Sequence, residues 1–123
     1  MNQKESAVTF LKMAGSGDVG AAYDKFIASD FIHHNQYFKG DRESLLKAME
    51  EAHKKSPNKS IEVKHVYQDG NNIITHSQVL RRDPNAAPVA VVHIFRFENN
   101  RVVELWDLGQ EILKNSPNEN GAF

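Results

Sequence analysis

Residues 94–107 read IFRFENNRVVELWD and predict two β-strands joined by a tight turn. The centre, Glu98-Asn99-Asn100-Arg101, is typical of a hairpin, because asparagine tolerates the left-handed backbone that short hairpin turns need. The residues on either side are rich in branched and aromatic side chains, which favour strands. We therefore expect strands over residues 89–97 and 102–113.

The segment before this hairpin predicts a second pair of strands. Residues 61–67 alternate apolar and polar side chains with a period of two, and residues 73–82 follow a turn sequence at residues 69–72. Residues 83–88 contain two prolines and form a loop. The second half of the chain thus predicts a four-stranded antiparallel meander.

The first half predicts three helices. Apolar residues recur at helical spacing over residues 4–15, and residues 15–17 (Gly-Ser-Gly) end that helix. Asp18 is expected to cap a second helix, and a third begins near Asp41 and ends at residues 56–58. Helices followed by a meander indicate the α+β class, with helices packed on one face of a curved sheet that encloses a pocket.

The chain has no repeat, low-complexity tract or linker, so we expect one domain over residues 1–123. The outer face of the sheet still needs cover, and its apolar residues favour a homodimer that packs through the sheet.

Composition excludes several classes of protein. The 15 basic and 16 acidic side chains give a net charge of −1, which argues against nucleic-acid binding. The absence of cysteine excludes disulfides, thiolate catalysis and cysteine-based metal sites. No apolar run is long enough to span a membrane, and the first residues do not resemble a signal peptide. A cytoplasmic protein with no membrane partner is expected.

Three segments carry a resemblance to a known family. The sequence Asp30-Phe31-Ile32-His33-His34-Asn35 after the second helix, together with the hairpin at residues 94–107, resembles the SnoaL-like polyketide cyclases of the NTF2-like superfamily. The ending SPNENGAF at residues 116–123 is similar to that of a bacterial subgroup of predicted aldol-condensation enzymes. The resemblance covers essentially the whole chain and implies an NTF2-like cone with a pocket inside it.

The resemblance also implies which residues carry the chemistry. In the family, an aspartate on the last strand is the general acid/base, and a histidine fourteen residues earlier lines the same pocket; Asp107 and His93 match this pair. Asn35 matches an asparagine that the family places in the pocket. The family's glutamine two residues before the histidine is Val91 here, so one polar contact is missing.

Further residues are candidates for the pocket by position. We expect His34 rather than His33 to face it, because adjacent side chains point in different directions. The remaining candidates for substrate binding are a second histidine and four aromatic wall residues: His76, Tyr23, Phe26, Phe95 and Trp106. His53 and His65 are interpreted as structural or surface residues.

Metal binding is not expected from the six histidines. None shows the His-x-x-x-His spacing of common zinc or iron sites. His76, His93, Asp107 and one of His33 or His34 could converge only through the fold, so the prediction is no metal and no cofactor.

The register of the hairpin leaves two possibilities for His93 and Asp107. A two-residue turn at Asn99-Asn100 alone pairs His93 with Trp106 and sends Asp107 to the opposite face. A three-residue turn, or a bulge, places His93 opposite Asp107.

Three functions fit this pattern. The leading hypothesis is acid–base chemistry on a small apolar carbonyl compound, either an intramolecular aldol condensation or an enolisation, catalysed by a lyase or isomerase. The second is a non-catalytic module that binds a small molecule in the same cone. The third is a dimerisation scaffold whose pocket is filled by side chains.

Overall fold

A computed structural model describes all 123 residues. Its elements follow one another as α1 (Gln3–Gly15), α2 (Val19–Phe26), β1 (Ile27–His33), α3 (Arg42–Lys55), β2 (Asn58–Asp69), β3 (Asn72–Arg81), β4 (Val89–Glu98) and β5 (Arg101–Glu111). None of the three helices combines the length and apolar content needed to cross a membrane.

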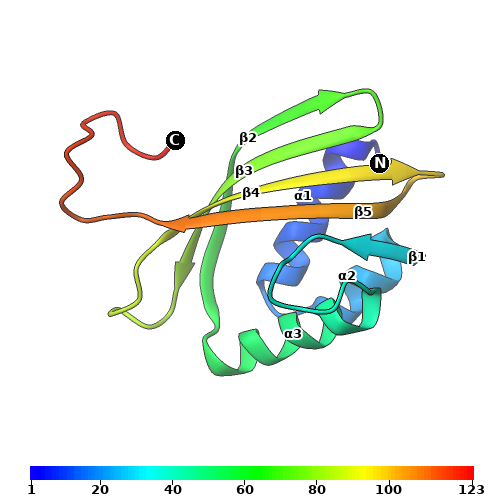
Figure 1. Cartoon of the computed structure of the whole chain (residues 1–123), viewed down its shortest axis with the longest axis horizontal. Helices are drawn as coiled ribbons and strands as arrows, with labels where there is room; N and C mark the ends of the chain where they lie inside the picture. Colours follow the sequence, from blue (N-terminus) through cyan, green and yellow to red (C-terminus); the bar gives the residue numbers. More distant parts are fainter.

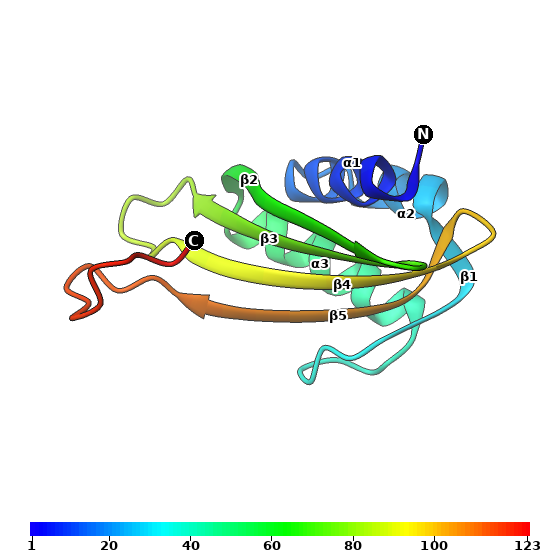
Figure 2. The ribbon, with the colours of Figure 1, turned by 90° about the horizontal axis from the view of Figure 1, so that it is seen from above.

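The five strands form one curved sheet in the order β1-β5-β4-β3-β2 (Figure 1). Neighbours from β2 to β5 are antiparallel, as the meander predicts, whereas β1 runs parallel to β5. The helices pack against the inner face of this sheet (Figure 2). The predicted α+β class, with N-terminal helices on a curved sheet, is confirmed.

The strand β1 was not among the predicted strands. It begins directly where α2 ends, and its polar residues Ser29 and Asp30 interrupt the apolar alternation. Its partner β5 is about 70 residues away in the sequence, and a parallel pair has no hairpin turn to announce it. The sheet therefore has five strands rather than four.

The helix ends show which capping predictions hold. The side chain of Asn2 accepts a hydrogen bond from the Glu5 amide at 2.8 Å, and the Glu5 carboxylate accepts one from the Asn2 amide at 3.1 Å. This reciprocal pair is a capping box and fixes the start of α1. Asp18 does precede α2, but its side chain makes no capping hydrogen bond.

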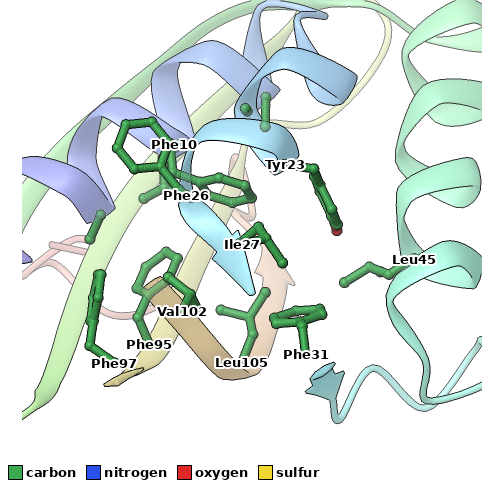
Figure 3. Close-up of a cluster of buried hydrophobic side chains, with 14 of the residues drawn as sticks. Phe10, Tyr23, Phe26, Ile27, Phe31, Leu45, Phe95, Phe97, Val102 and Leu105 are labelled. Carbon is green, nitrogen blue, oxygen red and sulfur yellow. The ribbon is translucent and has the colours of Figure 1, made fainter. Parts of the chain in front are cut away.

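An aromatic cluster joins the helices to the sheet (Figure 3). Phe10 of α1 lies at its centre, with ring centroids 5.7 Å from Tyr23, 6.5 Å from Phe26 and 6.0 Å from Phe95. Phe31 of β1 meets Tyr23 edge to face. Edge contacts of this kind stabilise a core beyond the area that they bury. The cluster fixes the inner face of β4 next to the candidate site.

Candidate active site

A tight turn and a bulge together set the register of the β4–β5 hairpin. Asn99 and Asn100 have φ angles of 50° and 64°, the left-handed conformation of a two-residue hairpin turn. Glu98 pairs with Arg101 and Phe97 with Val102, but Arg96 pairs with Glu104, which leaves Val103 as the extra residue of a bulge. Beyond the bulge, His93 lies directly opposite Asp107. The bulge alternative is therefore the correct one.

His93 and Asp107 lie on the inner face of the sheet. Phe95 and Leu105, two positions along each strand toward the turn, are buried in the core that the helices cover. Side chains two positions apart on a strand share a face, so His93 and Asp107 also point inward. Both are half-buried, and of the two only Asp107 lines the cavity described below.

Asn35 holds the carboxylate of Asp107. Its side-chain Nδ2 donates to Asp107 Oδ2 at 3.0 Å. Its own Oδ1 accepts from the Tyr37 amide at 3.0 Å, and its backbone amide donates to His33 Nδ1 at 3.1 Å. The side-chain amide of Asn35 is thus held at both its oxygen and its nitrogen. Oδ2 of Asp107 accepts the hydrogen bond from Asn35, whereas Oδ1 has no hydrogen-bond partner.

A cavity of about 550 Å³ opens beside Asp107. It lies between the loop that follows β1, the beginning of β4 and the end of β5. Its walls combine valines with polar side chains from both segments: His34, Asn35, Gln36, Tyr37, Val89, Val91, Asp107, Leu108, Gly109, Gln110 and Glu111. The volume is within the range of small-molecule sites.

His93 is neutral at physiological pH. Burial lowers the pKa of its imidazole to about 4, and the opposing attraction of Asp107 only partly offsets this effect. A neutral imidazole has one nitrogen that donates and one that accepts. His93 can therefore donate a hydrogen bond to a ligand without carrying a charge.

This shift in the pKa of His93 predicts a pH-dependent stability. The unfolded chain binds a proton at His93 near pH 6.5 and the folded chain only near pH 4, so stability is complete above pH 6.5 and falls as the pH drops through this window. By pH 5 the loss attributable to His93 is about 2 kcal/mol. Urea unfolding at pH 7 and pH 5 should show this loss in the wild type and a smaller one in His93→Gln. Equal losses in the two proteins would contradict the assignment.

His34 and Trp106 lie together on the outer side of the sheet. The His34 ring stacks on the Trp106 indole with centroids 4.7 Å apart and planes 4° apart. Its Nε2 donates to Glu104 Oε2 at 2.6 Å, and this bond, with a smaller effect of Arg96, lowers the pKa of Glu104. His34 borders the cavity by position, but its imidazole is engaged with residues on the face opposite Asp107. Trp106 does not line the cavity.

His33 is the histidine of this pair that points inward, and it has a structural role. It is 6% exposed, its Nε2 donates to the Lys39 carbonyl at 2.7 Å, and its Nδ1 accepts from Asn35. Both ring nitrogens are occupied in holding the loop after β1. His34 rather than His33 therefore lines the cavity, as expected, although its imidazole is held by Trp106 and Glu104.

His76 lies on the outer face, away from His93 and Asp107. On β3 the buried side chains are Ile73, Thr75 and Ser77, so His76 between them points to the opposite side. It lines a second cavity of about 650 Å³, between the outer face and the C-terminal segment, where its ring lies 4.9 Å from that of Phe123. No three His, Asp or Glu side chains come together as a potential metal site.

The remaining wall candidates belong to the core. Tyr23, Phe26 and Phe95 are at most 4% exposed, and none of them lines the cavity. The Tyr23 hydroxyl donates to Met49 Sδ at 3.4 Å, and burial raises its pKa well above the usual value. These rings form the dry packing behind the pair rather than a surface for the substrate.

Sequence reasoning missed two buried hydroxyls. Thr75 and Ser77 of β3 are fully buried on the inner face, and Thr75 lies directly opposite His93. The alternation Ile73-x-Thr75-x-Ser77-x-Val79 carries the signal, because it places two hydroxyls at core positions that are otherwise apolar.

The helices and the curved sheet thus form an open cone, with Asn35 and Asp107 at the edge of its cavity. The model of the SnoaL-like domain family matches residues 7–105, and the chain belongs to that family. The match includes Asn35 and His93 and ends two residues before Asp107. No curated protein matches the sequence.

Solved structures share the fold at low sequence identity. An NTF2-like protein of unknown function from Burkholderia xenovorans is 20% identical with a TM-score of 0.72, over 94% of this chain and 88% of that one. A protein assigned as a polyketide cyclase from Sinorhizobium meliloti is 18% identical with a TM-score of 0.69, over 88% and 100%. An LEH-like epoxide hydrolase from M. tuberculosis is 15% identical with a TM-score of 0.70, over 88% and 82%. The similarity establishes the fold.

Proposed function

We propose that the protein is a cyclase or isomerase that uses Asp107 as a base toward a small apolar carbonyl compound. The observation that carries this proposal is the row Asn35–Asp107–His93, in which Asn35 and Asp107 line the cavity and His93 lies directly behind them, opposite Asp107. Asn35 occupies one carboxylate oxygen of Asp107, so the other is available to take a proton from a carbon next to a carbonyl group.

His93 would stabilise the product of that step. Removal of the proton leaves an enolate, whose negative charge lies mainly on oxygen. A neutral imidazole that donates a hydrogen bond to this oxygen stabilises the enolate as it forms, and it does so most strongly where water is excluded. The valines Val89 and Val91 supply the apolar wall beside this position.

The enolate then has two possible fates. Its carbon can attack a second carbonyl carbon of the same molecule, forming a ring bond while the second carbonyl oxygen takes the proton from Asp107; this is an aldol addition, which becomes a condensation when the product then loses water. Alternatively, Asp107 returns the proton to a different carbon, and the net reaction is an isomerisation. Neither path consumes a cofactor.

The direct test is turnover of activated β-keto compounds. We expect wild-type protein to convert at least one member of a panel of β-keto esters and 1,3-diketones, and Asp107→Asn to convert it far more slowly. Equal turnover by the two proteins would refute the role of Asp107.

The second candidate is a module that binds an apolar ligand without converting it. The cavity beside Asp107 favours a ligand in either case. This candidate predicts binding that survives Asp107→Asn, with no turnover by either protein. Ligand-detected NMR on the same panel of compounds separates the two functions.

We also propose that two copies pack through the outer face of the sheet. Val92, Ile94 and Trp106 lie on this face, and Leu108 beside them is 67% exposed. Helices cover only the other face, and the C-terminal segment borders this one around His76, so a second copy would remove the remaining apolar surface from water.

Light scattering should therefore give twice the chain mass of 13.9 kDa. Leu108→Glu should shift the mass to that of the monomer, because it buries a charge in the interface. Lys47→Glu, on the exposed side of α3, should leave the dimer intact. A monomeric wild type, or a dimeric Leu108→Glu, would contradict the proposal.

A further inference from the structure

Two hydroxyls are buried on the inner face of β3 without any hydrogen-bond partner. Thr75 and Ser77 are both 0% exposed, and neither Thr75 Oγ1 nor Ser77 Oγ has a partner. Leaving a buried polar group unpaired destabilises the folded state, because the group loses its hydrogen bonds to water. Valine has nearly the same shape as threonine and would fill the position of Thr75 without this cost. Packing alone therefore does not account for a hydroxyl at position 75.

The partner available to Thr75 is His93. The two residues are directly opposite each other on β3 and β4, and both point to the inner face. Opposed side chains on antiparallel strands have Cβ atoms about 5 Å apart. His93 Nδ1 is also buried and has no partner. Thr75 has no exposed surface, so its hydroxyl makes no contact with bulk water.

We propose that Thr75 is a positioning residue whose hydroxyl donates to Nδ1 of His93 and so fixes the imidazole as the Nε2–H tautomer. Neither atom has a partner in the structure, so this bond requires the Thr75 side chain to rotate to another staggered position. Thr75, His93 and Asp107 then form one continuous row across β3, β4 and β5.

The tautomer matters for the function proposed above, on which this consequence rests. With Nδ1 accepting from Thr75, the proton of the neutral ring lies on Nε2, where it can be donated to an oxygen of the ligand. In the other tautomer Nε2 carries no proton and is a hydrogen-bond acceptor. The ligand oxygen is an acceptor too, so the two atoms could not form a hydrogen bond. Fixing the tautomer thus keeps His93 ready as a donor.

Nitrogen NMR of the free protein tests the positioning role without any substrate. Long-range proton–nitrogen correlations distinguish the protonated from the unprotonated ring nitrogen of His93. We expect the wild type and Thr75→Ser to show the Nε2–H tautomer alone, and Thr75→Val to show a shift of Nδ1 and a mixture of tautomers. An Nδ1–H tautomer in the wild type, or identical spectra for the wild type and Thr75→Val, would overturn the proposal.

Ser77→Ala is the matched control. It removes the second buried and unpartnered hydroxyl of β3, but Ser77 lies opposite Val91 rather than His93. The His93 signals should therefore be those of the wild type. If Ser77→Ala changed the tautomer as much as Thr75→Val does, the effect would be one of general packing, and the specific role of Thr75 would be refuted.

Turnover gives a second readout once a substrate is found. Loss of one neutral hydrogen bond predicts about a tenfold lower kcat in Thr75→Val, with KM unchanged and activity restored in Thr75→Ser. An unchanged kcat in Thr75→Val would overturn the catalytic consequence. Failure of the proposed function itself would appear differently, as equal turnover by the wild type and Asp107→Asn while the tautomer of His93 remains fixed.

Discussion

Replacing Asp107 by Asn is expected to lower turnover by a factor of about 10²–10⁴, the usual contribution of a general base. An amide cannot accept the proton of a carbon acid at neutral pH, whereas its oxygen can still accept the hydrogen bond from Asn35. The loss should therefore appear in kcat, with the cavity and the fold retained. Steady-state kinetics on a compound of the β-keto panel measures it.

Asp30→Asn provides the control for the loss of a carboxylate. Asp30 is exposed on β1 and makes no contact with the cavity, so its replacement should leave kcat unchanged. Thermal unfolding of both variants checks that each is folded at the assay temperature. If Asp107→Asn is folded and as active as Asp30→Asn, then Asp107 has no role in the reaction.

Replacing Phe10 by Ala is expected to lower the free energy of unfolding by about 3–5 kcal/mol. Phe10 is 1% exposed and its ring meets those of Tyr23, Phe26 and Phe95 within 6.5 Å. Alanine would leave a cavity that three rigid neighbouring rings cannot close. Urea unfolding followed by circular dichroism measures the effect.

Phe38 offers a matched comparison for Phe10. It is an equally large side chain, but it is 45% exposed in the loop after β1. Phe38→Ala should change stability by less than about 0.5 kcal/mol, as most surface substitutions do. A cost for Phe10→Ala no larger than for Phe38→Ala would show that the aromatic cluster does not hold the helices on the sheet.

Local patterns were enough to predict most of the fold. The meander from residue 61 onward follows from period-two alternation and two turn sequences, and the helices follow from apolar spacing and their end signals. The strand β1 did not follow from such patterns, because its pairing with β5 is non-local. Its recognition required the rest of the sheet to be in place.

The register of the β4–β5 hairpin shows where local patterns become ambiguous. Val102 and Val103 are both apolar and both buried, so either can serve as the residue that faces the core. The bulge resolves this ambiguity by accommodating both valines, and it thereby rotates Asp107 to the side of His93. A single inserted residue thus decides whether the candidate pair exists.

The candidate site could be predicted only in part, because the side of the sheet that each residue faces depends on this register. The positions of Asp107, His93 and Asn35 followed from the resemblance, and the structure brings these three together. His76 and Trp106 point to the other face because strand position alternates, a property that is decided only once the register is known. The imidazole of His34 is hydrogen-bonded to Glu104, which is 70 residues away in the sequence. Local sequence patterns do not predict such a contact.

The most direct measurement of the central claim is exchange of α-protons for deuterium. The probe is 2-tetralone, an apolar ketone, followed by proton NMR in D₂O with the exchange in buffer alone subtracted. If Asp107 removes a proton next to a carbonyl group, the wild type and Asp30→Asn should accelerate exchange equally, and Asp107→Asn should not. Acceleration by Asp107→Asn equal to that of the wild type, or none by any of the three proteins, would contradict the account.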